Sequence, residues 1–199
     1  MSKKPHAPAT VRNREPILAI LKTYIRDQPQ NIFELGSGTG EHGVFFANAL
    51  PHCTWHLSDR PENLPGIRQH KEASLLGNLE GPYELEIGVS KRPSVSMDLI
   101  FTANTFHIMS MEVVEKSIDI LGGALRKDQR FLVYGPFNYN GKFSSPSNEA
   151  FDQQLKSQDP AMGIRSFEDI DFAMQRNGLF LVEDHIMPAN NQLLVFQKG

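Results

Sequence analysis

Hydrophobic residues fall into two kinds of segment along this chain. Short, nearly continuous apolar runs are typical of strands in a parallel sheet that is covered on both faces. Longer stretches with apolar residues every three or four positions are typical of helices. The predicted strands are residues 31–35, 53–57 (ending at Ser58-Asp59), 83–89, 96–102, 130–134, 179–187 and 192–197. The predicted helices are residues 16–21, 41–50, 63–73, 111–125 and 166–177.

Residues with helix-capping chemistry mark several of these helix ends. Ser110 is placed as an N-cap, and Gly122-Gly123 loosens the end of the helix that follows it. Ser166 with Asp169 fits a capping box, and Gly178 stands where a C-terminal cap belongs. The positions expected to be buried in the helix 41–50 are Val44, Phe45, Ala47 and Leu50.

The order of these elements predicts the fold class. Strands alternate with helices through most of the chain, which favours a doubly wound α/β sheet. We expect a single domain over residues 11–199, preceded by a loose arm at residues 1–10. The last two strands are expected to form an antiparallel hairpin. Residues 137–164 break the alternation and are interpreted either as a lid or as a surface loop followed by a helix.

The composition is that of an ordinary globular protein, with 40% hydrophobic and 22% charged residues and a net charge of −3. This balance gives no reason to expect nucleic acid or a membrane surface as a partner. No apolar run is long enough to span a membrane, and no secretory signal is recognised. Cys53 is the only cysteine, which favours a reducing, cytoplasmic location.

Two nucleotide-loop patterns overlap after the first predicted strand. Read from Gly38, the sequence Gly38-x-Gly40-x-x-Gly43 is the dinucleotide pattern. Read from Glu34, an acid precedes the glycines at 36, 38 and 40. A turn at this place lies at the carboxyl end of the sheet, where ligands bind. A carboxylate at Glu34 would repel a pyrophosphate but suits a ligand with an ammonium or sulfonium group. S-adenosylmethionine (SAM) carries both of these groups and no phosphate.

A second carboxylate, Asp59, follows at the end of the second predicted strand. An acid there can accept both ribose hydroxyls of an adenosine, a feature that NAD and SAM sites share. Asp59 therefore supports adenosine, and Glu34 favours SAM over NAD. The remaining alternative is that no nucleotide binds, with Gly36, Gly38 and Gly40 as turn residues only.

Several further stretches carry a family resemblance. They are Arg12-Asn13, Glu15-Pro16-Ile17, 34–42, 103–108, 134–137, 143–148, Phe151-Asp152, Asp159-Pro160, 163–165 and 187–191. With the glycine loop, they resemble class I SAM-dependent methyltransferases. More narrowly, nearly the whole chain resembles the methyltransferase-like family known as domain of unknown function 938.

The resemblance implies seven strands with the last one antiparallel, and it implies SAM as cofactor. The implied cofactor residues are Arg12, Asn13, Glu34, Gly36, Ser37, Gly38, Thr39, Gly40, His42, Asp59, Glu86, Ile87 and Asn104. The family pattern has Leu-Asp-Val where this chain has Leu85-Glu86-Ile87, and the acid or backbone there is expected beside the adenine. Arg12 is interpreted either as a partner for the cofactor carboxylate or as a plain surface arginine.

Candidate catalytic residues follow the strand 96–102. Methyl transfer needs alignment of nucleophile and methyl group, and a base only when the nucleophile holds a proton. Asn104 is expected to orient the methionine end or the substrate. His107 is the best candidate base, because its ordinary pKa lies near the working pH. The alternative for His107 is that it caps a loop or packs against the next helix.

Other candidate substrate contacts lie further along the chain. Tyr134 as a catalytic residue and Phe137 as a substrate contact either form a wall of the site or pack in the core. Phe143 and Asn148 are expected to bind substrate from the candidate lid. His52 and His56 are about 13 Å apart along a strand, too far to share one metal ion, so no metal is expected.

These residues favour a SAM-dependent methyltransferase that acts on a small molecule. One alternative is a module that binds SAM or S-adenosylhomocysteine without turnover and works through a protein partner. The less favoured alternative is an NAD-dependent oxidoreductase. The methyl acceptor and the oligomeric state are not predicted.

Overall fold

The computed structural model describes residues 6–199. In chain order, with η for a short 3-10 helix, the elements are α1 (Pro8–Tyr24), β1 (Gln30–Leu35), α2 (Glu41–Ala49), β2 (Cys53–Asp59), η1 (Pro61–Asn63), α3 (Leu64–Ser74), β3 (Leu79–Glu84), β4 (Leu99–Ala103), η2 (Phe106–Ile108), α4 (Met111–Gly122), β5 (Arg130–Gly135), β6 (Phe137–Asn138), α5 (Pro146–Gln158), β7 (Arg165–Ser166), α6 (Phe167–Arg176), β8 (Leu179–Met187), η3 (Pro188–Asn190) and β9 (Asn191–Lys198).

The main sheet has seven strands in the order β3-β2-β1-β4-β5-β9-β8. Strand β1 pairs in parallel with both β2 and β4, and β2 pairs in parallel with β3. Strand β9 runs antiparallel to β5 and to β8. The α/β sheet with an antiparallel last strand is therefore confirmed, and so is the closing hairpin.

Helix α1 corrects the predicted N-terminal arm. The helix begins at Pro8 and not near Pro16, so residues 8–10 of the predicted arm are helical. Residues 1–5 of that arm lie outside the described residues. Pro8 is tolerated in the first turn because its missing N–H has no partner to lose there. Part of the buried face is polar, which apolar periodicity does not count. That face comprises Thr10, Asn13, Ile17, Leu18 and Leu21.

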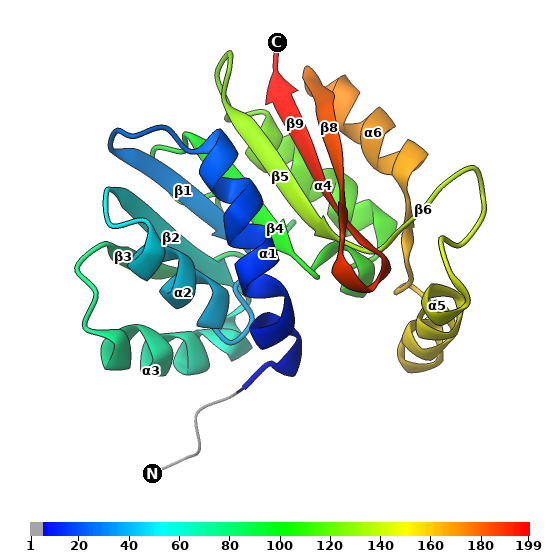
Figure 1. The fold of residues 1–199 in the computed structure, drawn as a ribbon, viewed down its shortest axis with the longest axis horizontal. Helices are drawn as coiled ribbons and strands as arrows, with labels where there is room; N and C mark the ends of the chain where they lie inside the picture. Colours follow the sequence, from blue (N-terminus) through cyan, green and yellow to red (C-terminus); the bar gives the residue numbers. More distant parts are fainter. Residues whose placement is uncertain (1–5) are drawn as a thin grey trace. The chain divides into compact units, whose positions relative to one another are not determined.

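The chain divides into two compact units between Phe101 and Thr102, inside β4. In unit one, α1, α2 and α3 lie together on one side of β1, β2 and β3 (Figure 1). The aromatic core joins Phe46 to Trp55 and Phe101, with ring centroids 5.2 Å and 5.5 Å away. Ala47 and Leu50 are buried as predicted, whereas Val44 and Phe45 are only half-buried and Phe46 takes the core position.

Strands β3 and β4 begin at different residues from those predicted. Strand β3 spans Leu79–Glu84 instead of 83–89. Its first part was not predicted because the dipeptide Gly81-Pro82 is typical of a turn. Pro82 is tolerated there because β3 is an edge strand of the sheet. Strand β4 begins at Leu99 instead of residue 96. Among the described helices, none is both long and apolar enough to cross a bilayer.

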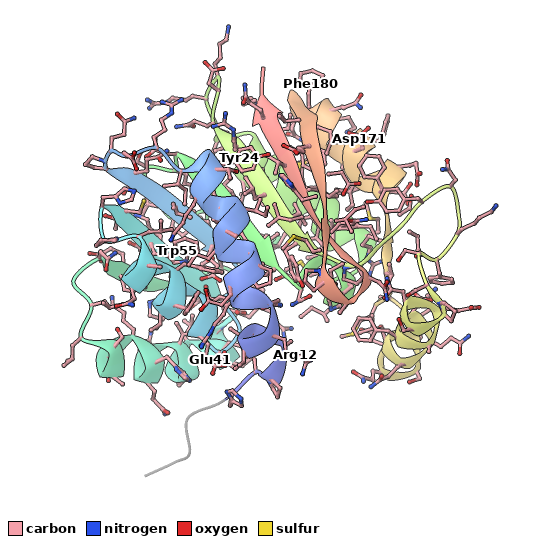
Figure 2. All side chains as sticks on the ribbon, viewed as in Figure 1. Arg12, Tyr24, Glu41, Trp55, Asp171 and Phe180 are labelled. Atoms are coloured by element: carbon pink, nitrogen blue, oxygen red, sulfur yellow. The ribbon has the colours of Figure 1, made fainter. Side chains whose placement is uncertain are left out.

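Unit two contains β5, β9 and β8 together with α4 and α6. The helices α4 and α6 lie beside each other (Figure 1). Its helices start where their caps were predicted. The Ser110 hydroxyl accepts a hydrogen bond from Val113 N, and the Ser166 hydroxyl accepts one from Asp169 N. Phe180 projects from the edge strand β8 and is exposed (Figure 2).

The segment 137–164 is attached to the rest of unit two at several points. Strand β6 pairs in parallel with β7, and α5 follows a loop and is capped by Ser145. Tyr139 stacks on Phe167 with centroids 5.2 Å apart, and its hydroxyl donates to Asp184 Oδ2 at 2.7 Å. These contacts hold the loop before α5 against α6 and β8. A lid movement of this segment stays a prediction.

Candidate functional site

The glycine loop lies at the carboxyl end of β1 in unit one. Gly36, Gly38 and Gly40 have φ angles of 72°, 58° and 84°, a left-handed region that glycine adopts without steric cost. Apart from Gly38 itself and its two chain neighbours, no atom of the described residues lies within 4 Å of the position that a Gly38 Cβ would occupy. The loop is therefore sharply bent and leaves the backbone at Gly38 open to a ligand.

Asp59, at the end of β2, is joined directly to this loop. Its Oδ2 accepts a hydrogen bond from Gly38 N at 2.6 Å. Its Oδ1 accepts from Arg60 N at 2.8 Å and from Asn63 Nδ2 at 2.9 Å. A carboxylate offers about four acceptor positions, so these three donors leave room for a further one. Asn63 was not among the predicted site residues.

Ser37 fixes the loop to β2 from the other side. Ser37 N donates to Ser58 O at 2.9 Å, and Ser58 N donates to Ser37 Oγ at 3.1 Å. The Ser37 hydroxyl in turn donates to Glu34 Oε2 at 3.2 Å. Every polar group of Ser37 named here bonds within the protein, so its contribution to a ligand site is the shape of the loop.

Glu34 is buried beneath the loop, with 2% of its surface exposed. Its Oε2 also accepts from Trp55 Nε1 at 2.9 Å. Burial raises the pKa of Glu34 to about 7, although the hydrogen bonds from Trp55 and Ser37 act to lower it. The sequence predicts an ionised Glu34 carboxylate that faces the ligand. The carboxyl instead contacts Trp55 and Ser37, and it is partly protonated at neutral pH.

Gly43, in the first turns of α2, is a site residue that the predictions left out. A Cβ there would overlap the Leu57 Cδ2 methyl group and would lie 2.8 Å from Glu34 Oε2. The absence of a side chain allows α2 to pack closely on β1 and β2. This is the packing role of the third glycine in the dinucleotide pattern, so the pattern itself contained the signal.

Asn13 and His42 contact each other between α1 and α2. The distance from His42 Nε2 to Asn13 Oδ1 is 2.8 Å, and both side chains are buried. Burial lowers the pKa of His42 to about 4, so the ring is neutral and its Nε2–H donates. The His42 ring stacks on Phe46 at 5.4 Å. This pair joins the two helices, whereas Arg12 is exposed on α1 (Figure 2).

Thr39 and Glu41 hold the start of α1 beside the glycine loop. Glu41 Oε2 accepts from Thr39 Oγ1 at 2.9 Å and from Ala7 N at 2.7 Å. Glu41 Oε1 lies 2.7 Å from His6 Nδ1. Burial would raise the pKa of Glu41, but the hydrogen bonds from Ala7, His6 and Thr39 outweigh it and lower that pKa.

Glu86 and Ile87 lie in the turn after β3, not in a strand. Val89 N and Ser90 N both donate to Glu86 O, and the Glu86 side chain is exposed. Leu85 N donates to Asp59 O at 2.9 Å, which brings this turn to the end of β2. Unit one therefore gathers the glycine loop, Asp59 and residues 85–87, as the adenosine interpretation requires.

Asn104 directly follows β4 and belongs to unit two. It has a φ of 57°, and its N–H donates to Tyr134 O at 2.9 Å. A left-handed asparagine is a sparsely populated conformation, and such residues concentrate at functional sites. Asn104 is half-buried, whereas Tyr134 is buried with 3% of its surface exposed.

His107, in η2, is also buried in unit two. Its ring meets the Phe151 ring edge-on at 5.2 Å. Burial lowers the pKa of His107 to about 4, and the charge of Arg165 acts in the same direction. The ring is therefore neutral at pH 7, and the ordinary pKa expected for His107 from the sequence is wrong. A neutral imidazole is the form that can accept a proton, but a pKa of about 4 makes His107 a weaker base than an ordinary histidine.

The candidate substrate contacts have different surroundings in unit two. Phe137 is buried with 2% of its surface exposed, and Phe143 is half-buried. Asn148 Nδ2 donates to Ser144 Oγ at 2.8 Å and to Asn190 O at 3.0 Å. Asn148 therefore ties α5 to η3. Among residues 6–199, no three His, Cys, Asp or Glu side chains are grouped as metal ligands would be.

Similar solved structures share the fold. Human N-acetylserotonin methyltransferase, solved with SAM, matches with 14% identity and a TM-score of 0.81 over 96% of this chain and 53% of its own. An O-methyltransferase family protein from Burkholderia thailandensis matches with 16% identity and a TM-score of 0.80 over 96% and 57%. An O-methyltransferase family 2 protein from Planctomyces limnophilus, solved with apigenin, matches with 18% identity and a TM-score of 0.74 over 88% and 52%.

The strand order and these likenesses define the fold as that of the class I SAM-dependent methyltransferases. The present chain spans about half the length of those structures. It belongs to the family described as "Protein of unknown function (DUF938)", whose model matches residues 4–198.

Proposed function

We propose that this protein binds SAM in unit one and transfers its methyl group to a small molecule. The observation that carries the proposal is the direct hydrogen bond between Gly38 N and the Asp59 carboxylate. It places the acid that suits a ribose diol against the open backbone of a glycine loop at the ends of β1 and β2.

The residues of unit one fit the chemical groups of SAM. Asp59 has acceptor capacity for one further donor, which a ribose hydroxyl would supply. The backbone of Glu86 and Ile87 would bind the adenine, since both follow the residue that contacts Asp59. Gly36 to Gly40 would enclose the methionine part, and Arg12 would pair with its carboxylate. When bound, SAM supplies an electrophilic methyl group, and its transfer leaves S-adenosylhomocysteine.

In unit two, His107 and Asn104 are proposed to act on the methyl acceptor. The neutral His107 ring would take the proton of a hydroxyl or amine nucleophile, and the Asn104 carboxamide would orient the acceptor. A small acceptor is supported by the similar structures, one of which holds apigenin and another of which is named for N-acetylserotonin. The net charge of −3 gives no electrostatic reason to propose nucleic acid.

Calorimetric binding of SAM, S-adenosylhomocysteine and NADH tests the cofactor assignment. The variant Asp59→Ala removes the ribose acceptor and leaves Gly38 N without its partner, so binding of both SAM-type ligands should weaken roughly tenfold or more. Asp27→Ala changes an exposed acid in the same unit and should bind as the wild type does. If wild type binds neither SAM-type ligand, or if Asp59→Ala binds them unchanged, the proposal is wrong.

The NADH measurement also tests a specific alternative. Because Glu34 is partly protonated and its Oε2 is bonded to Ser37 and Trp55, it no longer argues strongly against a pyrophosphate. Gly43 also has the packing role of the third dinucleotide glycine. Tight NADH binding without SAM binding would therefore assign the loop to an NAD-dependent oxidoreductase.

A binding module without turnover is the second candidate function. It is favoured by the burial of Tyr134 and Phe137 and by the internal bonds of Asn148, which leave fewer side chains for a substrate. Production of S-adenosylhomocysteine from SAM with a metabolite extract separates the two functions. Tight SAM binding with no turnover, together with one stoichiometric protein partner on purification, would support the module.

A further inference from the structure

The loop that carries His107 is held by an arginine from a distant part of the sequence. Arg165, in β7, donates from Nε to Phe106 O at 3.0 Å and from Nη2 to Met109 O. The same Nη2 donates to Ala161 O at 2.8 Å. One guanidinium thus binds the residue before His107, a residue just after it, and the backbone that leads to β7.

The residues before Arg165 strengthen this connection. Gly163 N donates to His107 O at 2.9 Å, and Ile164 N donates to Asp152 Oδ1 at 2.8 Å. Gly163 has a φ of 150°, and a Cβ there would lie 2.8 Å from Asp152 Oδ1. The backbone at 163–165 is therefore held between α5 and the His107 loop, and no larger residue fits at Gly163.

The geometry favours arginine over lysine at position 165. Binding carbonyls that lie on both sides of His107 requires several N–H donors in a fixed plane. A guanidinium has five such donors, whereas an ammonium is a compact charge on a flexible stem. The carbonyl of His107 itself is bound by Gly163, so the loop backbone is fixed at three carbonyls, those of Phe106, His107 and Met109.

We propose that Arg165 is the positioning residue for His107, because it fixes the loop backbone and thereby the direction of the imidazole ring against Phe151. This inference rests on the proposed role of His107 as the base. Arg165 is also the charged group whose field acts on His107, and Asp152 is the charged group whose field acts on Arg165.

Three variants of the full chain test this proposal by NMR. Arg165→Gln removes both the fork and the charge, Arg165→Lys keeps the charge alone, and Arg176→Gln removes an exposed arginine of α6 that lies 3.7 Å from Asp119. The measurements are the titration of the His107 ring and the exchange rate of the Gly163 amide.

The two substitutions at Arg165 should have different signatures. Arg165→Gln should raise the pKa of His107 and accelerate exchange at Gly163. Arg165→Lys should leave that pKa nearly unchanged but still accelerate exchange, because the carbonyls lose their planar donor. Arg176→Gln should change neither. Unchanged His107 titration and unchanged Gly163 exchange in both Arg165 variants would overturn the proposal. If Arg165→Gln does not fold, the exchange rate of the Gly163 amide in Arg165→Lys tests the proposal alone: faster exchange supports it and unchanged exchange overturns it.

Turnover provides an independent readout. With an acceptor in hand, Arg165→Lys should lower kcat roughly tenfold or more and leave the KM for SAM unchanged, as expected when a reacting group is misplaced. Equal kcat values would also count against the positioning role. The NMR measurements need no turnover. Absence of activity in the wild type would therefore remove the methyltransferase assignment while the arginine's effect on His107 was still measured.

Discussion

At the scale of single residues, the protonation of Glu34 is set by burial and not by its position in a motif. Both donors that reach this carboxyl, Ser37 Oγ and Trp55 Nε1, converge on Oε2. A proton on Oε1 is therefore compatible with both hydrogen bonds. The nearby charge of Asp59 adds to the raised pKa. Glu34 is best understood as a neutral or half-neutral support of the loop.

The raised pKa of Glu34 predicts a pH-dependent stability. The carboxyl of Glu34 has a pKa of about 7 in the folded state and 4.5 in the unfolded state. Its contribution to the free energy of unfolding is therefore fully present below pH 4.5 and is lost as the pH rises through 7. The variant Glu34→Gln keeps an acceptor for the two donors and removes the titration. The free energy of unfolding of wild type should fall relative to Glu34→Gln between pH 5 and pH 8, by up to about 3 kcal/mol.

Urea unfolding of both proteins at several pH values in this range measures the difference. Comparing the two proteins cancels the titration of groups common to both, such as His42 and His107. A difference that stays constant from pH 5 to pH 8 would show that Glu34 is ionised in the folded protein, as the motif alone suggests.

At the scale of elements, α2 packs on the sheet through a glycine. A methyl group at Gly43 would have to displace the Leu57 side chain or the hydrogen-bonded Glu34 carboxyl, both of which are buried. Gly43→Ala should therefore lower the free energy of unfolding by roughly 1–3 kcal/mol. The higher helix propensity of alanine offsets up to about 1 kcal/mol of this loss.

The matched control for that substitution is Gly77→Ala. Beyond its two chain neighbours, no atom in residues 6–199 lies within 4 Å of the position of its Cβ, so its free energy of unfolding should stay near that of wild type. Both variants are compared by chemical denaturation. A Gly43→Ala protein as stable as Gly77→Ala would mean that α2 shifts on the sheet at little cost.

The elements that were predicted correctly have local signals, and those that were missed do not. Ser110 and Ser166 cap helices by bonding to backbone only three residues away, so sequence order alone identifies them. Strand β3 contains Gly81-Pro82, a dipeptide that is typical of a turn. A proline is tolerated in this strand because the strand lies at the edge of the sheet, and that position depends on the tertiary structure. The start of α1 was missed because its first buried residues are polar.

The same distinction applies to the candidate site. The glycine loop and Asp59 were predicted because strand ends and glycine spacing define their positions. The role of Arg165 was not predicted, because its partners in the His107 loop are backbone carbonyls 56 and 59 residues earlier in the chain, which carry no side-chain signature. The low pKa of His107 also depends on burial, which arises from tertiary packing and not from the local sequence.

At the scale of the whole molecule, a single domain is expected to unfold cooperatively. The division between the units falls inside β4, so neither unit contains all of that strand. We expect the two units to unfold together in one transition. Trp55 is the only tryptophan and lies in unit one, so its fluorescence reports on that unit alone.

Urea unfolding followed by Trp55 fluorescence and by far-UV circular dichroism tests this expectation. The two curves should coincide, with equal midpoints and slopes. A fluorescence midpoint clearly separated from that of circular dichroism would show two independently stable parts. The expectation of one domain over residues 11–199 would then be wrong.

The close packing of Gly43 against Leu57 also limits how the family can vary. A side chain at position 43 occupies space that the Leu57 methyl now fills. A larger residue at position 43 therefore requires a smaller residue at position 57, together with a shift of the Glu34 carboxyl. Across aligned family members, these two positions should covary, with glycine at 43 accompanying a large residue at 57. The double variant Gly43→Ala with Leu57→Val should accordingly lose less free energy of unfolding than the sum of the losses in the two single variants.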